Sequence, residues 1–200
     1  MKTERHAEGP RVHVAYMLLA SNWRDVEALP ALAQNWGVSQ VVVNNLSFIG
    51  SAALEKASLF ERPDLWDPAL GALEGAKLRA AALGIDLYYY RPDSQKPHAI
   101  CTENVLRACF VSHRGDVSPC VLTNISVQEG IAQPHFFRGR ALPVERFVFG
   151  NLRQQTLSEI WHSARACAFR AVFERPLTQQ HGFENELPEP CRHCYKLFEP

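Results

Sequence analysis

The chain reads RVHVAYMLL over residues 11–19, NWRDVEALPALAQNWG over residues 22–37 and VSQVVV over residues 38–43. The two outer runs are apolar with few breakers, which is typical of buried strands. In the middle run apolar residues recur every three or four positions, with Asn22 placed to cap a helix and Gly37 to end it. This stretch therefore predicts a strand, a helix and a second strand. The near-continuous apolar run at 38–43 is typical of a parallel strand that helices cover on both faces.

The alternation of strand and helix continues through one further helix and one further strand. Asp67 and Pro68 are placed to start a helix that runs to Gly84, and residues 85–90 predict a further strand. In it Tyr88 and Tyr90 share one face, which is expected to pack in the core or at a domain interface. The proline-bounded linker at residues 92–97 ends the alternation. We therefore expect an α/β domain over residues 1–92 and a cysteine-rich domain over residues 93–200.

Composition and charge narrow the class of protein. The 200 residues carry 21 Lys and Arg against 21 Asp and Glu, so no net field favours nucleic acid or an anionic membrane. Apolar runs fall short of the roughly 20 residues of a membrane span, and the polar residues 1–10 do not form a secretory signal. We expect a cytoplasmic protein without nucleic-acid or membrane partners. In that reducing compartment six cysteines indicate thiols or metal ligands rather than disulfides.

Two local patterns stand out beyond the linker. Residues 105–113 and 117–123 flank a glycine-centred turn and predict a β-hairpin. Thr156 and Glu159 form a capping pair at the start of a helix of about four turns. Its expected apolar face consists of Leu157, Ile160, Trp161, Ala164, Cys167 and Ala168.

The spacing of the cysteines points to a metal site. Cys191 and Cys194 are two residues apart, which supplies half of a tetrahedral set of ligands. Cys101, Cys109 and Cys120 lie around the predicted hairpin, so thiols from its two ends can meet the terminal pair. Buried free thiols and a four-cysteine zinc site are the alternatives, although zinc sites usually combine two Cys-x2-Cys pairs and the chain has one.

Five segments together resemble the auxiliary-cluster region, called a SPASM or twitch domain, of radical S-adenosylmethionine (radical SAM) enzymes. They are Cys101, RGDVSPC at 114–120, FGNL at 149–152, TLSEIW at 156–161 and CRHCY at 191–195. The resemblance implies that Cys101, Cys120, Cys191 and Cys194 hold one auxiliary 4Fe-4S cluster. Cys109 and Cys167 do not fit the pattern and are expected to be small core residues.

Residues 11–90 resemble the last strand-helix units of the partial, TIM-like barrel of the same family. The three-cysteine Cys-x3-Cys-x2-Cys motif of that family, which binds the cluster that cleaves S-adenosylmethionine, is absent from the sequence. S-adenosylmethionine is therefore expected only if the rest of the barrel is supplied by an N-terminal half or a partner chain. Whether the chain is part of an enzyme stays open at this point.

Two functions follow from these expectations. The first is an iron-sulfur-binding part of a radical SAM enzyme whose cluster positions a peptide or protein substrate or transfers electrons. The second is a non-enzymatic module that binds zinc or an iron-sulfur cluster and acts with a partner chain. An unpaired strand edge at residues 11–19 also predicts poor solubility for the chain on its own.

Overall fold

The computed structural model describes residues 11–91, 101–125, 134–174 and 186–199. The chain divides into two compact units, one of residues 1–46 and 56–92 and the other of residues 47–55 and 93–200. Residues 47–55 were expected in the first domain, but they pack with the second unit. The backbone N–H of Phe136 donates to the carbonyl oxygen of Ile49 at 2.8 Å, and that of Gly139 donates to the Glu55 carboxylate at 2.8 Å.

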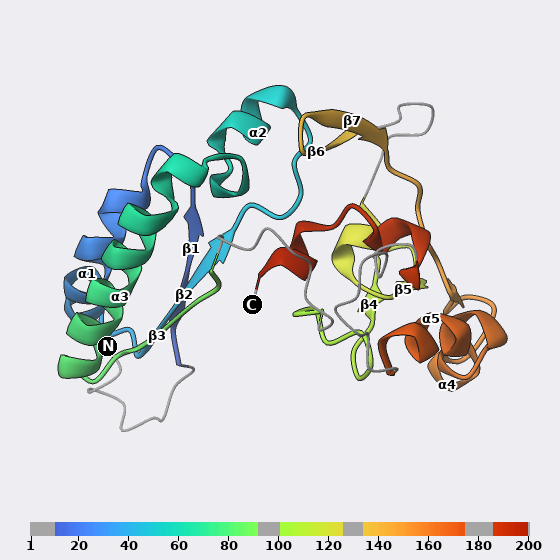
Figure 1. Ribbon diagram of the computed structural model, residues 1–200. Coiled ribbons are helices and arrows are strands. Elements are labelled where there is room, and N and C mark those ends of the chain that lie inside the picture. The colour runs from blue at the N-terminus through green and yellow to red at the C-terminus, as the bar shows by residue number, and fades with distance from the viewer. Residues whose placement is uncertain (1–10, 92–100, 126–133, 175–185, 200) are drawn as a thin grey trace, which may run out of the picture. The chain divides into compact units, whose positions relative to one another are not determined.

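A parallel three-stranded sheet forms the centre of the first unit (Figure 1). Its strands follow the chain in the order β1 (His13–Leu18), β2 (Gln40–Asn45) and β3 (Asp86–Tyr89). β1 pairs with β2 in the register Tyr16 to Val43, and β2 pairs with β3 in the register Val41 to Leu87. The alternating strand and helix segments predicted for this part of the chain are thus observed, and the unit is a small α/β structure.

Helices cover one face of this sheet. The 3-10 helix η2 (Trp23–Ala28), α1 (Leu29–Asn35) and α3 (Trp66–Ala82) pack on it, with α1 and α3 on the same side in Figure 1. Their common core with the sheet is Leu18, Trp23, Val26, Leu29, Ala33, Val38, Val41, Val43, Leu59, Ala69, Leu70, Ala72, Leu73, Ala76, Ala80, Ile85 and Leu87. On the opposite face Met17 is 46% exposed and Tyr88 is 53% exposed. The expectation that helices cover both faces is therefore wrong for the described part of this unit. Tyr88 does not lie in the core, and the alternative that it packs at a domain interface stays a prediction.

The helix ends differ in part from the predicted ones. Gly37 ends its helix with a φ of 64° as predicted. Asn22 precedes η2, but its side chain turns back instead of capping, accepting from Leu19 N at 2.8 Å and donating to Met17 O at 3.0 Å. α3 begins at Trp66, so Asp67 lies inside its first turn. Three short helices lie between β2 and α3 in the chain: α2 (Ala52–Ala57), η3 (Leu59–Glu61) and η4 (Pro63–Leu65).

An antiparallel three-stranded sheet organises the second unit. It has the order β4 (Phe110–Val111), β5 (Asp116–Ser118) and β8 (Gly150–Asn151). The hairpin of β4 and β5 is shorter than predicted, but its turn contains Gly115 at a φ of 85°, where a side chain would be strained. Asn151 Nδ2 donates to the Arg114 carbonyl at 3.1 Å and to Asp116 Oδ1 at 2.8 Å. The Gly-Asn segment therefore braces the turn that leads to Cys120.

A second hairpin joins β6 (Pro134–Phe137) to β7 (Arg140–Pro143). Its two turn residues, Arg138 and Gly139, have φ values of 50° and 76°, as a tight primed turn requires. Phe137 packs against Tyr195 and Phe198, with ring centroids 4.8 and 5.8 Å apart. This hairpin was not predicted from the sequence, and it forms one wall of the site described below.

The predicted helix after Thr156 is two helices. α4 (Leu157–Trp161) begins with the predicted capping box, in which Thr156 Oγ1 accepts from Glu159 N and the Glu159 carboxylate accepts from Thr156 N. The chain then turns at residues 162–163 before α5 (Ala164–Glu174). Because the turn resets the helical phase, α5 buries Ala166, Phe169, Arg170 and Phe173 rather than the expected residues.

The described part of the second unit also contains three short 3-10 helices, η5 (Val121–Thr123), η7 (Glu189–Cys191) and η8 (Tyr195–Phe198). Among the described residues, no helix combines the length and the apolar character needed to cross a membrane.

Candidate metal centre

The four cysteines predicted as ligands all lie in the second unit at the edges of turns or short helices. Cys101 opens a turn in which Asn104 N donates to its carbonyl oxygen at 3.2 Å. Cys120 directly precedes η5 and Cys194 directly precedes η8, while Cys191 is the last residue of η7. None of the four has a disulfide partner.

The structure brings these four thiols within electrostatic reach of one another. Burial raises the pKa of Cys101 to about 11 and also raises the pKa of Cys120. Burial, followed by the charges of the other thiols, raises the pKa of Cys191 and of Cys194. Cys101 and Cys120 contribute to both of these shifts. A group of buried thiols that oppose one another's ionisation is suited to a positively charged ligand.

Three of the thiols share a local hydrogen-bond geometry that favours the thiolate. The sulfur of Cys101 accepts from the backbone N–H of Glu103, that of Cys120 accepts from Leu122 and Thr123, and that of Cys194 accepts from Lys196. Each hydrogen bond lowers the thiol's pKa against the larger effect of burial. Backbone N–H groups directed at cysteine sulfurs are also a means by which proteins tune iron-sulfur clusters.

The thiols do not converge closely enough for one ion. Within the described part of the chain, no three His, Cys, Asp or Glu side chains form a group that could hold a single metal ion. Zinc-sulfur bonds of about 2.3 Å would bring tetrahedral thiolates to within about 3.8 Å of one another. The four thiols thus influence one another's pKa, but the described side chains do not form a group as compact as these distances require.

The donor set fits an iron-sulfur cluster. Four thiols match the ligands of a 4Fe-4S cluster in number and kind. Beside them, the hydroxyl oxygen of Thr102 is buried and has no hydrogen-bond partner among the described residues. A buried hydroxyl without a hydrogen-bond partner costs free energy. A cluster sulfide or ligand sulfur near it would accept a hydrogen bond from this hydroxyl.

A buried polar network adjoins the thiols. Lys196 Nζ lies 3.1 Å from Glu199 Oε2 and 3.4 Å from Glu103 Oε1, and Ser47 Oγ donates to Glu199 Oε1 at 3.1 Å. Burial would lower the pKa of Lys196, but the two carboxylates raise it overall. The Lys196 charge in turn lowers the pKa of Cys101. A fixed cation thus lies beside the candidate ligands.

His135 on β6 holds the loop between Cys191 and Cys194 in place. Its Nδ1 accepts from Ile49 N at 3.3 Å, so its Nε2 carries the proton that is donated to the His193 carbonyl at 2.9 Å. The ring stacks on Phe48, with centroids 5.3 Å apart and planes 15° apart. Burial lowers the pKa of His135, which favours this neutral, donating form.

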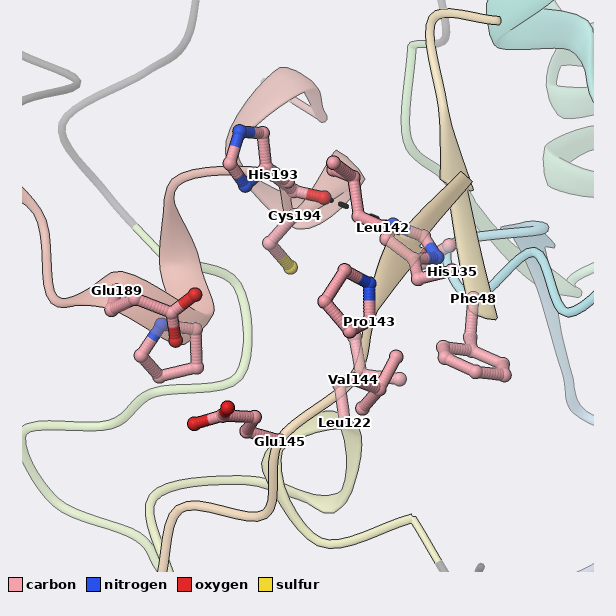
Figure 2. A pocket seen from close by; sticks show the side chains of 12 residues that line it. Phe48, Leu122, His135, Leu142, Pro143, Val144, Glu145, Glu189, His193 and Cys194 are labelled. Carbon is pink, nitrogen blue, oxygen red and sulfur yellow. Dashed lines mark hydrogen bonds between the residues drawn. The ribbon is translucent and has the colours of Figure 1, made fainter. Parts of the chain in front are cut away.

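A pocket of about 60 Å3 opens next to Cys194. Figure 2 shows the Cys194 sulfur directed into it, with the carboxylates of Glu145 and Glu189 on the same side of the opening. The remaining lining residues are mostly apolar: Phe48, Leu122, Leu142, Pro143, Val144 and Pro190, with Ser47, His135 and His193. A molecule in this pocket would touch a candidate ligand residue directly.

The other two cysteines lie elsewhere. Cys109 is half-buried and lines a separate opening with Arg107, Leu157, Ser158 and Trp161. Cys167 is exposed, with its sulfur 3.5 Å from Arg170 Nη2. The expectation that Cys167 is a core residue is therefore wrong, because the turn at residues 162–163 rotates it away from the buried face of α5.

Several residues of the site were missed in the sequence. His135 and Glu145 lie in the loop-like stretch between the predicted hairpin and helix, where no periodic pattern distinguishes them. Lys196 and Glu199 are three residues apart, a spacing that indicates a helical pair, but a single such pair is common on surfaces. Ser47 joins the network only because residues 47–55 pack with the second unit.

Comparison with known proteins agrees with these observations. Residues 101–195 match the SPASM family, described as an iron-sulfur cluster-binding domain. The chain is also 23% identical over 163 residues to the tungsten-containing aldehyde ferredoxin oxidoreductase cofactor-modifying protein of Pyrococcus furiosus. The match covers 82% of this chain and 42% of that protein, so the chain corresponds to less than half of the relative's length.

Proposed function

We propose that this chain carries one auxiliary 4Fe-4S cluster, held by the thiolates of Cys101, Cys120, Cys191 and Cys194, as part of a radical SAM system. The SPASM match over residues 101–195 supports iron-sulfur binding and includes all four cysteines. The observation that carries the assignment is the gathering of these four thiols, none of them in a disulfide, in one region of the second unit, where the charges of Cys101 and Cys120 raise the pKa of both Cys191 and Cys194. When bound, such a cluster supplies a redox centre or a charged surface for a substrate.

The chain's own residues prepare the site for a cluster. The backbone N–H groups of Glu103, Leu122 and Lys196 favour thiolates at three of the four positions. His135 fixes the loop that carries the terminal pair, and Lys196 places a positive charge near Cys101. Hydrogen bonds and nearby cations raise the reduction potential of a cluster because they stabilise the added electron.

A zinc module that acts with a partner chain is the alternative. A zinc site needs the same four thiolates, so the identity of the ligand cysteines does not distinguish zinc from a 4Fe-4S cluster. Zinc sites usually combine two Cys-x2-Cys pairs, and the chain has one, which favours the cluster. A direct count of metal and sulfide decides between them.

The role of the cluster rests on the rest of the system. We propose that it positions a peptide or protein substrate or transfers electrons, and that S-adenosylmethionine is bound only when a further barrel segment completes the first unit. The three parallel strands in chain order, with helices on one face, are compatible with a sector of a TIM-like barrel. In the described residues β1 pairs along one edge only, which leaves an edge for such a segment.

A second candidate substrate comes from the relative. Its name assigns it a role in modifying the cofactor of a tungsten enzyme. A corresponding role for this chain would replace the peptide with a cofactor precursor and leave the cluster assignment unchanged.

The test is to purify the full chain anaerobically, reconstitute it with iron and sulfide, and measure iron, sulfide and zinc per chain with the visible absorption. About four irons and four sulfides with a broad brown absorption are expected. One zinc without sulfide would replace the cluster with a structural metal and remove the redox role.

A further inference from the structure

The pocket beside Cys194 has a mixed lining, in which apolar side chains lie beside polar groups that include two carboxylates. Leu142, Pro143 and Val144 form part of its wall, and Glu145 and Glu189 stand at its opening (Figure 2). Neither lysine nor arginine lines it. The pocket therefore suits a ligand that is apolar along its length and positively charged at its end.

The two carboxylates lack counterions in the described part of the chain. Glu145 and Glu189 are both exposed, and neither forms an ion pair with another described residue. The nearest arginine in sequence, Arg146, is occupied by Asp116 and by Asn124 Oδ1. A cationic group at the opening would thus meet two acceptors that no described cation neutralises.

An organic cation fits this pocket better than a metal ion. Calcium and magnesium require six or more oxygen ligands or several bound waters, and the pocket offers two carboxylates. The apolar wall would contribute nothing to a metal ion. It would, however, bury the methylene groups of a long side chain at about 0.8 kcal/mol each.

We propose that this pocket binds a lysine or arginine side chain of a peptide or protein substrate, with its stem on Leu142, Pro143 and Val144 and its charge between Glu145 and Glu189. This inference rests on the proposed function, because it names the substrate class of the same centre. Cys194, a proposed cluster ligand, is one of the lining residues, so the bound residue would lie beside the proposed cluster. The carboxylates disfavour an anionic substrate at this position.

The test is a ligand-observed NMR titration of the reconstituted chain with two peptides, acetyl-Gly-Lys-Gly amide and acetyl-Gly-norleucine-Gly amide. Norleucine keeps the aliphatic stem and removes the charge. We expect the lysine peptide to bind about tenfold more tightly and to weaken as salt is added. Glu145→Gln and Glu189→Gln are each expected to reduce this preference at least about threefold. Glu174→Gln, an exposed carboxylate on α5, is the matched control and should leave it unchanged.

Equal binding of the two peptides, or a preference that survives both pocket variants, would overturn the inference. Iron and sulfide are counted in the same samples. A normal cluster without discrimination between the peptides removes the inference and leaves the proposed function. A glutamate-dependent preference in a chain that takes up no cluster removes the proposed function and leaves a cation pocket.

Discussion

Gly150 should be among the least replaceable residues of the second unit. A Cβ atom at this position would lie 2.9 Å from Ile160 Cγ1 and 2.7 Å from Gln155 Oε1. The Gln155 amide is the end of a flexible side chain and can move. Ile160 is fully buried and cannot move without displacing its neighbours. We expect Gly150→Ala to destabilise the unit by about 2 kcal/mol, the usual cost of overpacking a core.

Thermal denaturation of the reconstituted chain measures this effect. A loss of about 2 kcal/mol corresponds to a melting temperature about 10 °C lower for a domain of this size. Gly50→Ala is the control in the same unit, because its Cβ would make an ordinary contact of 3.5 Å with Phe48. Its melting temperature should stay within about 2 °C of the original. Equal melting temperatures for Gly150→Ala and the parent chain would refute the close approach of α4 to β8.

Three further predictions concern the site and its support. Alanine at Cys101, Cys120, Cys191 or Cys194 should abolish cluster binding, whereas Cys109→Ala and Cys167→Ala should keep it; iron per chain is the measurement, and equal loss in all six variants would contradict the ligand assignment. Thr156→Ala should destabilise α4 by about 1 kcal/mol through the lost cap, seen as a shift of the denaturation midpoint at constant slope. His135→Ala leaves the Ile49 N–H and the His193 carbonyl without their partner, so a chelator should remove iron several-fold faster than from the parent chain; an unchanged rate would show that His135 does not hold the Cys191–Cys194 loop.

The local elements of the first unit could be predicted because their signals are local. Apolar runs with few breakers and a glycine at a helix end determine strands and helix ends without reference to the rest of the chain. Which face is covered is a tertiary property. Val41 and Val42 are both apolar, yet Val41 is buried under the helices and Val42 is only partly covered. A continuous apolar run therefore could not show that one face lacks helices within the unit.

In the second unit, short motifs predicted where a helix begins, but they did not predict which residues each helix buries. The capping box at Thr156 is confirmed, because it depends on residues three positions apart. The exposure of Cys167 follows from a turn at residues 162–163 that no glycine or proline marks. Ser47 and Phe48 contribute to the site because residues 47–55 belong to the second unit, although they lie between two segments of the first unit in the sequence. No residue spacing indicates this.

We propose that the thiolates of Cys101, Cys120, Cys191 and Cys194 hold one iron-sulfur cluster. Native mass spectrometry of the anaerobically reconstituted chain tests it most directly, since it reports the intact mass of each species. We expect one added species, with the mass of about four irons and four sulfides. An added mass of a single zinc ion, or none at all, would contradict it.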